Sequence, residues 1–447
     1  MSGIIVLLFL FAVEIGYSCY AVVTGKAVKQ LKNYVNLIEL LLLFLFMLTG
    51  IMPFGFRWGM LFVVLLIRGI VSLISTLRWK KGKWTEKEKS LGKQIGRCLL
   101  NLVLVGFACI PAFIFADFKA IPTDGSHPFE SLSYTWTDSD RIETLDESGE
   151  NRKVTVQFWY PTDAAGDEKY PLVIFSHGAY GFRGSNQSLC EELASNGYVV
   201  CSIDHTYHAI FSAQEDGKIV TINPQFLKEV SMTNSPEIDE EESLRITDGW
   251  LLVRTGDMNF VLDQIIEKSN GSLTEADNPA LYQHIDTTKI ALTGHSLGGA
   301  TAAEVGRNRD DISAVVDIDG TMMGDIVSAK GEETVLDTTP YPIPLLNIYG
   351  QYHYEGSRPL GEDYPNILAT ETGMDSMETV ILGAQHLNYT DLPLFAPGIA
   401  KMMGTQGVGD VDTRACIQKL DEIILNYCNH YLKGSENLMI EKEISLK

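Results

Sequence analysis

The sequence predicts an α/β domain with a mostly parallel β-sheet, preceded by a membrane region of four helices. Seven short apolar runs alternate with helical or loop segments after residue 150, which is typical of parallel strands covered by helices. Four long apolar stretches within the first 116 residues indicate the membrane region. The seven expected strands are residues 154–159, 172–176, 198–203, 289–293, 314–318, 345–349 and 379–382.

The four apolar stretches each have about the 20 residues that a helix needs to cross a bilayer. They cover residues 3–24, 36–53, 57–76 and 97–116. The first could instead be a cleaved signal peptide, but it lacks a basic start and carries Glu14 in its apolar part. We therefore expect residues 1–117 to form a transmembrane region with four helices and residues 118–447 to form a separate domain.

The distribution of lysine and arginine predicts how the chain crosses the membrane. Basic residues concentrate in the first and third connections, whereas the second has only Arg57. Because basic loops stay on the cytoplasmic side, we expect a multi-pass protein of the cell membrane whose domain after Asp117 is extracytoplasmic. The basic residues are Lys26, Lys29 and Lys32 in the first connection and Arg78, Lys80, Lys81, Lys83, Lys87, Lys89, Lys93 and Arg97 in the third.

Three ionisable residues, Glu14, Glu39 and Arg68, fall within the apolar stretches. Such side chains are costly in hydrocarbon unless they are paired. Glu39 and Arg68 should both lie in the cytoplasmic half, so we expect a structural ion pair between them rather than a transport or signalling role.

The remainder of the chain is strongly acidic. Residues 1–117 hold 13 Lys and Arg against 5 Asp and Glu, whereas residues 118–447 hold 22 against 52. An acidic surface repels phosphate, so we expect no nucleic-acid partner. The sequence does not determine an oligomeric state.

A serine stands where the expected strand 289–293 turns into a helix rich in small residues. The segment reads Gly294-His295-Ser296-Leu297-Gly298, and glycines on either side let strand and helix approach closely. This setting is typical of the nucleophile elbow of α/β-hydrolases and favours Ser296 as a nucleophile over an incidental tight turn.

A nucleophilic serine needs a histidine base and donors for an oxyanion. The loop after the strand 172–176 and the residue after the nucleophile supply these donors in α/β-hydrolases, which indicates the amides of Ala179 and Leu297. The base comes last in the chain, from a loop beside the serine. His386 follows the last expected strand and is favoured, with His353 as the alternative; His430 lies on a helical pattern.

The orienting acid is expected at the end of the strand 314–318. Asp319 ends that strand and is our candidate, although a turn-forming role before Gly320 is the alternative.

The pairing of Phe175-Ser176-His177-Gly178 with the Ser296 segment resembles the platelet-activating-factor acetylhydrolase family of the secreted, lipoprotein-associated type and its bacterial relatives, within the α/β-hydrolase superfamily. The resemblance covers roughly residues 150–430. It implies Ser296, Asp319 and His386 as the triad and Ala179 and Leu297 as the oxyanion amides. Many other α/β-hydrolases carry the acid one strand later, which leaves Glu355, and also Asp317, as alternatives. The membrane region departs from the secreted enzymes.

Two further segments allow more than one interpretation. Asp204, His205 and His208 could ligate a metal, but no further ligand with suitable spacing is present, so we expect neither a metal nor another cofactor. Residues 204–250 form a polar insertion, with Glu237 opening its acidic run, that either caps the site or is a solvated loop. After it, residues 251–266 predict an amphipathic helix in which Arg254 and Asp257 pair.

Together these features predict a membrane-anchored serine hydrolase that cleaves carboxylic esters through an acyl-enzyme. The resemblance implies short or oxidised acyl chains of phospholipids as substrates, so the expected partners are small ester or lipid molecules and membrane lipids. A general carboxylesterase, an acyltransferase to a cell-envelope acceptor and a catalytically silent membrane receptor or scaffold are the alternatives.

Overall fold

The computed structural model describes residues 2–24, 29–50, 52, 55–81, 91–233, 235, 238–331, 333–404 and 407–446. The expectations for Lys26, Lys83, Lys87, Lys89 and Glu237 lie outside these residues. The chain divides into two compact units, Met1–Phe118 with Phe395–Ile399, and Lys119–Leu394 with Ala400–Lys447. Each unit is described by itself.

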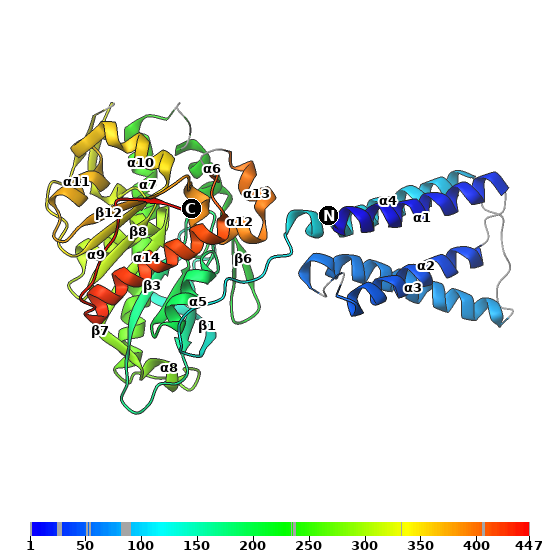
Figure 1. Cartoon of the computed structure of the whole chain (residues 1–447), viewed down its shortest axis with the longest axis horizontal. Coiled ribbons are helices and arrows are strands. Elements are labelled where there is room, and N and C mark those ends of the chain that lie inside the picture. Colours follow the sequence, from blue (N-terminus) through cyan, green and yellow to red (C-terminus); the bar gives the residue numbers. More distant parts are fainter. Residues whose placement is uncertain are drawn as a thin grey trace. The chain divides into compact units, whose positions relative to one another are not determined.

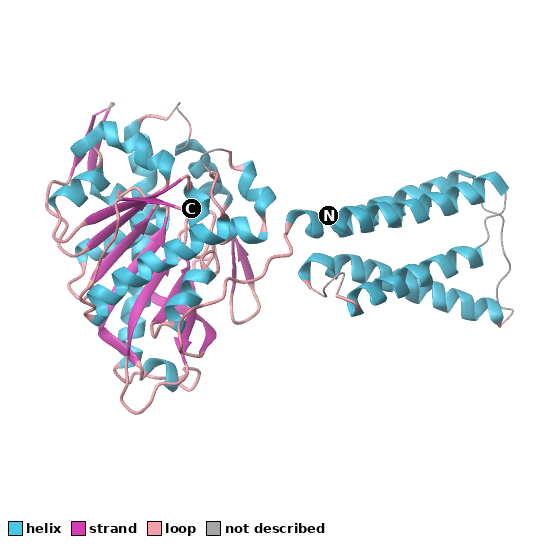
Figure 2. Ribbon diagram, in the orientation of Figure 1, coloured by secondary structure: helices cyan, strands magenta, loops and turns pink. Residues whose placement is uncertain are grey.

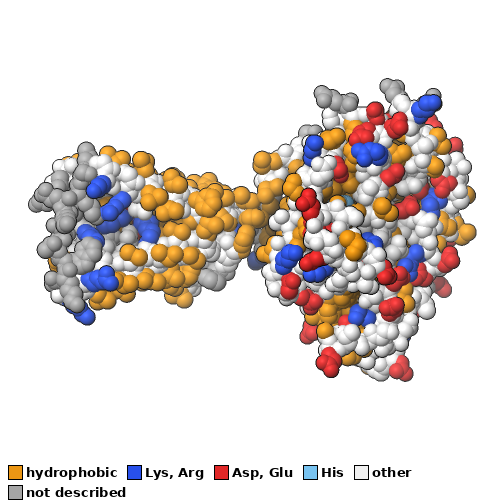
Figure 3. Space-filling model, turned by 180° about the vertical axis from the view of Figure 1, so that it is seen from behind, with side chains coloured by type: hydrophobic (Ala, Val, Ile, Leu, Met, Phe, Trp, Pro, Cys, Tyr) orange, Lys and Arg blue, Asp and Glu red, His pale blue; other side chains and the backbone are white. Residues whose placement is uncertain are grey.

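The first unit contains four long apolar helices, drawn in blue to cyan in Figure 1. All four are long and apolar enough to cross a membrane, as the sequence predicts. Figure 3 shows patches of apolar side chains along the face of these helices that it draws. The helices are α1 Ser2–Thr24, α2 Lys29–Leu48, α3 Phe56–Lys80 and α4 Leu91–Ile114.

Ionisable side chains of these helices meet one another inside the bundle. Arg68 Nη2 lies 3.0 Å from Glu39 Oε2, which is the expected ion pair, and 3.1 Å from Glu14 Oε2. Glu14 also accepts from Lys32 Nζ and, at 2.8 Å, from Asn101 Nδ2. One charged network thus connects α1, α2, α3 and α4, because each polar group in a bundle of this kind needs a partner.

The second unit is an α/β fold around a nine-stranded sheet with the order β1-β2-β4-β3-β7-β8-β11-β12-β13. Figure 2 shows the sheet in magenta between layers of helices. The seven strands β4-β3-β7-β8-β11-β12-β13 are parallel to one another, whereas β2 is antiparallel to both β1 and β4. All seven expected strands are present: β2 Asn151–Pro161, β3 Tyr170–Ser176, β4 Val199–Asp204, β7 Ile285–His295, β8 Ala314–Ile318, β11 Leu345–Tyr349 and β12 Met377–Leu382.

Two strands of the main sheet were not predicted. The long strand β1 Phe129–Ile142 pairs only with β2, and polar residues such as Glu130 and Ser131 on this edge hide its pattern. The strand β13 Glu443–Ser445 has three residues and pairs with β12. Two small hairpins lie outside the main sheet: β5 Phe211–Ala213 with β6 Ile219–Thr221, and β9 Ile326–Lys330 with β10 Glu333–Leu336.

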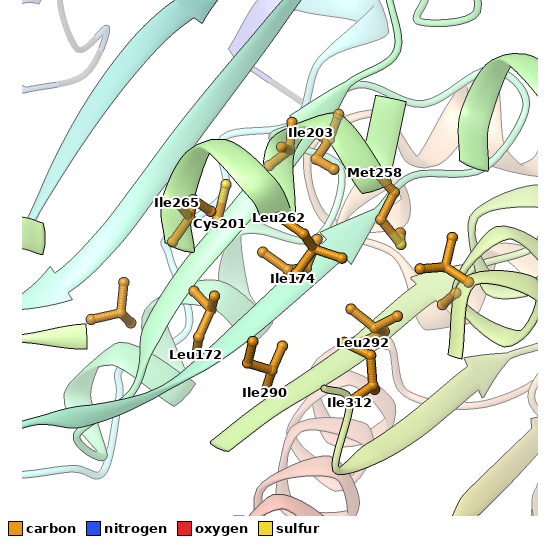
Figure 4. Close-up of a cluster of buried hydrophobic side chains, with 14 of the residues drawn as sticks. Leu172, Ile174, Cys201, Ile203, Met258, Leu262, Ile265, Ile290, Leu292 and Ile312 are labelled. Atoms are coloured by element: carbon orange, nitrogen blue, oxygen red, sulfur yellow. The ribbon is translucent and has the colours of Figure 1, made fainter. Parts of the chain in front are cut away.

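The sheet is buried on both faces because side chains alternate along each strand. In β3, Leu172 and Ile174 pack with Leu262 and Ile265 of α7, as Figure 4 shows. Val173 and Phe175 of the same strand pack against α5 and α14 on the other face of the sheet. The helices are α5 Gln187–Ser195, α6 Pro224–Thr233, α7 Glu240–Ser269, α8 Pro279–Tyr282, α9 Leu297–Asn308, α10 Gln351–Ser357, α11 Pro365–Thr372, α12 Leu392–Phe395, α13 Pro397–Met402 and α14 Thr413–Lys433, with 3-10 helices η1 Met323–Asp325, η2 Arg358–Asp363 and η3 His386–Tyr389.

The polar insertion 204–250 contains more regular structure than its sequence indicates. It holds β5, β6, α6 and the first turns of α7, which begins eleven residues before the expected helix 251–266. The side chain of Asp239 caps α7 by accepting from Glu242 N at 2.7 Å. The acidic residues 240–242 lie in the first turn, where a helix favours negative charge, so an acidic run that suggested a loop is a helix start.

Candidate active site

Ser296 stands at the turn between β7 and α9 with a backbone φ of 57° and ψ of −125°. Residues other than glycine rarely adopt this backbone conformation. Its occurrence at Ser296 indicates backbone strain, which is common at active sites. A Cβ on Gly294 would lie 2.2 Å from the Gly298 backbone, and one on Gly298 would lie 2.0 Å from Ser176 O. The turn therefore requires glycine at both positions, as the sequence motif predicts.

The structure brings the expected acid and base together. Asp319 follows β8 and His386 opens η3 after β12, and His386 Nδ1 lies 2.6 Å from Asp319 Oδ2. Because a carboxylate only accepts, His386 Nδ1 carries the proton of this bond, which leaves its Nε2 free to accept one. Asp319 Oδ1 accepts from Gly350 N at 2.5 Å.

The electrostatics of Asp319 favour the carboxylate form. Burial disfavours its charge, but the hydrogen bonds from His353 and His386 outweigh burial and hold the pKa of Asp319 below its ordinary value. Asp319 therefore stays ionised at neutral pH and can hold His386 in one tautomer.

His386 lies next to the Ser296 turn. The ring of His386 is 4.4 Å from that of His295, centroid to centroid, and His295 Nε2 donates to the carbonyl of His386 at 2.9 Å. Burial lowers the pKa of His295 to about 3, so His295 is neutral and acts as a donor without adding charge.

The loop that carries Ala179 lies against the same turn. A Cβ on Gly178 would lie 3.3 Å from Ser296 Cβ and 3.0 Å from His295 Nδ1. Leu297 is the first residue of α9, where the backbone N–H groups have no partner within the helix. The loop that leads to Ala179 and the first residue of α9 therefore both lie close to Ser296.

Part of the insertion packs against the side chains of Leu297 and Ala179. Side chains from α6 and the start of α7 form an apolar cluster that includes Leu297, and Ala179 packs against it. Of the two interpretations of residues 204–250, the packing favours a cap. The cluster consists of Phe226, Val230, Ile246, Trp250, Leu251, Leu297 and Ala300.

The alternative acids occupy other positions. Asp317 accepts from Gly320 N and Asn366 Nδ2, and burial raises its pKa to about 7, which fits a structural carboxyl. Glu355 is exposed and accepts from Gln351 at 2.7 Å. Asp319 is therefore the one of the three candidates that meets His386.

The alternative base, His353, binds the same acid as His386. His353 Nδ1 lies 2.9 Å from Asp319 Oδ1, and its Nε2 lies 2.5 Å from the hydroxyl of Tyr364. Sequence reasoning did not find this shared acid or Tyr364, because the residues meet only through the folding of separate loops. His430 lies on α14, as its helical pattern predicts, and its Nδ1 bonds Ser435 O.

The residues considered as a metal site, Asp204, His205 and His208, contact other side chains in the structure. His205 Nε2 lies 2.9 Å from Ser176 Oγ, and its Nδ1 lies 3.0 Å from Asp257 Oδ2. Asp204 accepts from Arg183, and His208 stacks on Phe226. No group of three metal-ligating side chains is present among the described residues.

The expected pair between Arg254 and Asp257 is wrong. Asp257 is bound by Arg152, through Nε at 2.5 Å and Nη2 at 2.7 Å, and by Arg141 at 2.9 Å. Arg254 instead donates to the carbonyls of His177 and Gly178. The helical spacing predicts which residues share a face, but strands β1 and β2 provide the arginines that bind Asp257.

The mostly parallel sheet, the strained serine turn and the Asp–His pair define a protein of the α/β-hydrolase class. The family described as platelet-activating factor acetylhydrolase, isoform II, matches residues 151–443, and the chain belongs to this family. The sequence resemblance is thereby confirmed.

Curated relatives and solved structures agree with this assignment. The chain is 23% identical over 278 residues to platelet-activating factor acetylhydrolase of Canis lupus familiaris, covering 59% of this chain and 58% of the relative. It is 24% identical over 294 residues to a probable 1-alkyl-2-acetylglycerophosphocholine esterase of Arthroderma benhamiae, covering 62% and 65%. The chain thus spans less than two thirds of these relatives. Ferulic acid esterase of Streptomyces cinnamoneus shares the fold with a TM-score of 0.54 at 19% identity, covering 72% of this chain and 95% of that structure.

Proposed function

We propose that this protein is a membrane-anchored serine esterase that hydrolyses carboxylic esters of lipids. The observation that carries the proposal is the 2.6 Å hydrogen bond between His386 Nδ1 and Asp319 Oδ2 beside the strained Ser296 turn. Family membership supports an ester-hydrolysing activity.

In the proposed mechanism, Ser296 Oγ attacks the ester carbonyl while His386 Nε2 takes its proton. The carbonyl oxygen becomes an oxyanion, which the amides of Ala179 and Leu297 stabilise. His386 returns the proton to the leaving alcohol, and an acyl-enzyme forms on Ser296. Water, activated by His386, then releases the acid. Asp319 holds the imidazole and stabilises its charged form throughout.

The proposed substrates are phospholipids with short or oxidised acyl chains. One relative is named as an esterase of an acetylated glycerophosphocholine and another, of Schizosaccharomyces pombe, as a putative phospholipase A2.

The test is a substrate screen with the full-length protein in detergent micelles. Phospholipids with acetyl, oxidised and long unmodified acyl chains are offered, with Ser296→Ala as the matched blank, and free acid is measured. We expect release from the acetylated and oxidised lipids and none with the variant. Addition of an acceptor alcohol separates hydrolysis from acyl transfer, and no release by the wild type from any ester would contradict the proposal.

The membrane placement is also a proposal, with the catalytic domain outside the cell. It is supported by the four apolar helices and by the basic third connection, of which Arg78, Lys80, Lys81, Lys93 and Arg97 are described. We expect an impermeant maleimide to label Asp216→Cys in intact cells but to label Lys80→Cys only after permeabilisation, each against the wild-type background of seven cysteines. The reverse pattern would place the domain in the cytoplasm.

A further inference from the structure

Two side chains, those of His177 and Arg254, donate hydrogen bonds to the carbonyl of the peptide unit between Gly178 and Ala179. The Gly178 carbonyl accepts from His177 Nδ1 at 2.6 Å and from Arg254 Nη2 at 3.2 Å, and Arg254 Nη1 donates to the His177 carbonyl. This peptide unit is the one whose N–H belongs to Ala179. Its orientation therefore decides where the proposed oxyanion donor points.

A trans peptide directs its N–H away from its carbonyl, and no cis peptide occurs in the described residues. Because the Gly178 carbonyl faces Arg254, the Ala179 N–H faces the opposite side. The position of a Cβ on Gly178, 3.3 Å from Ser296 Cβ, shows that the loop lies against the nucleophile. Arg254 and Ser296 thus act on the same short loop.

Arg254 carries a buried charge without a carboxylate partner. Its side chain is fully buried, its Nε has no hydrogen-bond partner, and it forms no ion pair within the described part of the chain. The nearby Asp257 is already bound by Arg141 and Arg152. A buried guanidinium that donates only to carbonyls is unusual, because its desolvation is not offset by an opposite charge.

The other titratable groups facing this charge are neutral or paired. Burial lowers the pKa of His205 to about 4 and that of His177 and His208 well below their ordinary value, so these three rings are neutral at pH 7. Arg152 is paired with Glu143 as well as with Asp257. Burial also lowers the pKa of Arg254, to about 9, which still leaves it charged at neutral pH.

We propose that Arg254 is a positioning residue of the oxyanion hole. Its fork holds the carbonyls of His177 and Gly178, which fixes the Ala179 N–H toward the reacting oxygen. Its charge also polarises that peptide, so the negative oxyanion of the transition state supplies the counter-charge that the resting site lacks. The inference rests on the proposed function.

A positioning role of Arg254 can be distinguished from a purely structural role by the stage of the reaction that its loss affects. Loss of a structural residue lowers the amount of folded enzyme or weakens all binding. Loss of an oxyanion-hole contact lowers kcat and leaves KM nearly unchanged, because the interaction forms only as the oxyanion develops. Loss of the contact also weakens the binding of trifluoromethyl ketones, which form a tetrahedral adduct, more than the binding of uncleavable ether analogues of the substrate.

The experiment compares Arg254→Met and Arg254→Lys in the full-length protein, with Arg245→Met as the control. Arg245 lies on the same helix, is exposed, and bonds only Glu242 among the described residues. We expect Arg254→Met to lower kcat about 100-fold with KM within about twofold, as for loss of one oxyanion donor. Arg254→Lys keeps the charge but not the fork, so its loss should be smaller. Arg245→Met should behave as the wild type.

Several results would overturn the inference. They are a folded Arg254→Met enzyme with kcat within about twofold of the wild type, a rise in KM alone, and equal loss of affinity for the ketone and the ether analogue. If neither Arg254 variant shows a thermal unfolding transition, His177→Phe removes the other side-chain donor to the Gly178 carbonyl, which also accepts from Gly181 N at 3.1 Å. We then expect kcat to fall about tenfold, and an unchanged kcat would refute the role of this carbonyl. An inactive wild type would refute the proposed function instead.

Discussion

The described residues of the second unit include two Ser–His–Asp arrangements, which share a bond from His Nδ1 to Asp Oδ2 but differ in burial and in the backbone at the serine. In one, His386 bonds Asp319 beside the Ser296 turn; in the other, His205 joins Ser176 to Asp257. Ser176 is fully buried in a regular strand, whereas Ser296 is half-buried at a strained turn.

The comparison shows that burial and backbone conformation decide which arrangement can react. The carboxylate of Asp257 is also bound by Arg152 and Arg141, and burial lowers the pKa of His205 to about 4. A histidine that resists protonation is a poor base, and an ester cannot reach a serine inside the sheet. The buried arrangement therefore supports the loop after β3, and the exposed one is our candidate for catalysis.

The largest contrast is expected from removing each serine hydroxyl. Ser296→Ala should lower kcat for ester hydrolysis by about a million-fold, as is typical for a triad serine. Ser176→Ala removes one buried hydrogen bond and should leave kcat within about threefold, while costing about 1 kcal/mol of stability. Steady-state kinetics of both full-length variants measures the contrast, and similar losses in the two would erase it.

The next largest difference in kcat is expected between substitutions of the two candidate acids, Asp319 and Glu355. Asp319→Asn should lower kcat about 10,000-fold, because the amide holds His386 in the wrong tautomer. Glu355→Gln, at an exposed residue that bonds Gln351, should have little effect. An inactive Glu355→Gln beside an active Asp319→Asn would move the acid to the loop after the later strand.

The buried arrangement around His205 should affect the stability of the protein and its dependence on pH, not the rate of ester hydrolysis. Burial, followed by Arg254, lowers the pKa of His205 to about 4, whereas Asp257 opposes the shift. The folded protein binds this proton more weakly than the unfolded chain. His205 therefore contributes stability that is complete above about pH 6.5 and is lost as the pH falls toward 4, by roughly 3 kcal/mol.

Thermal unfolding of the full-length protein in detergent tests this difference. Between about pH 7.5 and pH 4.5, we expect the wild type to lose more stability than His205→Gln, which cannot take up the proton. Parallel losses in the two proteins would mean that His205 is not held neutral by its surroundings.

The smallest effect is expected at the second histidine on Asp319. His353→Gln removes one hydrogen bond from the acid, which keeps Gly350 N and His386, so kcat should fall only about tenfold. His386→Gln, assayed in parallel, should be nearly inactive. If His353→Gln is the inactive variant, the base has been assigned to the wrong loop.

Much of the fold of the second unit could be predicted because its strands are apolar on both faces. The seven central strands and the positions of Ser296, Asp319 and His386 follow from short local patterns. The edge strand β1 could not be predicted from its polar sequence, and the acidic start of α7 resembles a loop until its cap is seen.

The partners of charged residues could not be predicted for a different reason. Asp257 binds Arg152, which is 105 residues away in sequence, and Asp319 binds a second histidine, His353, from another loop. Helical spacing suggested Arg254 for Asp257, but such long-range contacts depend on how the strands and loops meet. No periodic pattern in the sequence records them.

The most direct test of the central claim is to find which serine reacts with a fluorophosphonate. The full-length protein in detergent is labelled, digested and analysed by mass spectrometry. The account predicts a single adduct on the peptide containing Ser296, its loss in Ser296→Ala and its persistence in Ser176→Ala. An adduct on Ser176, or ester hydrolysis that continues without any adduct on Ser296, would contradict it.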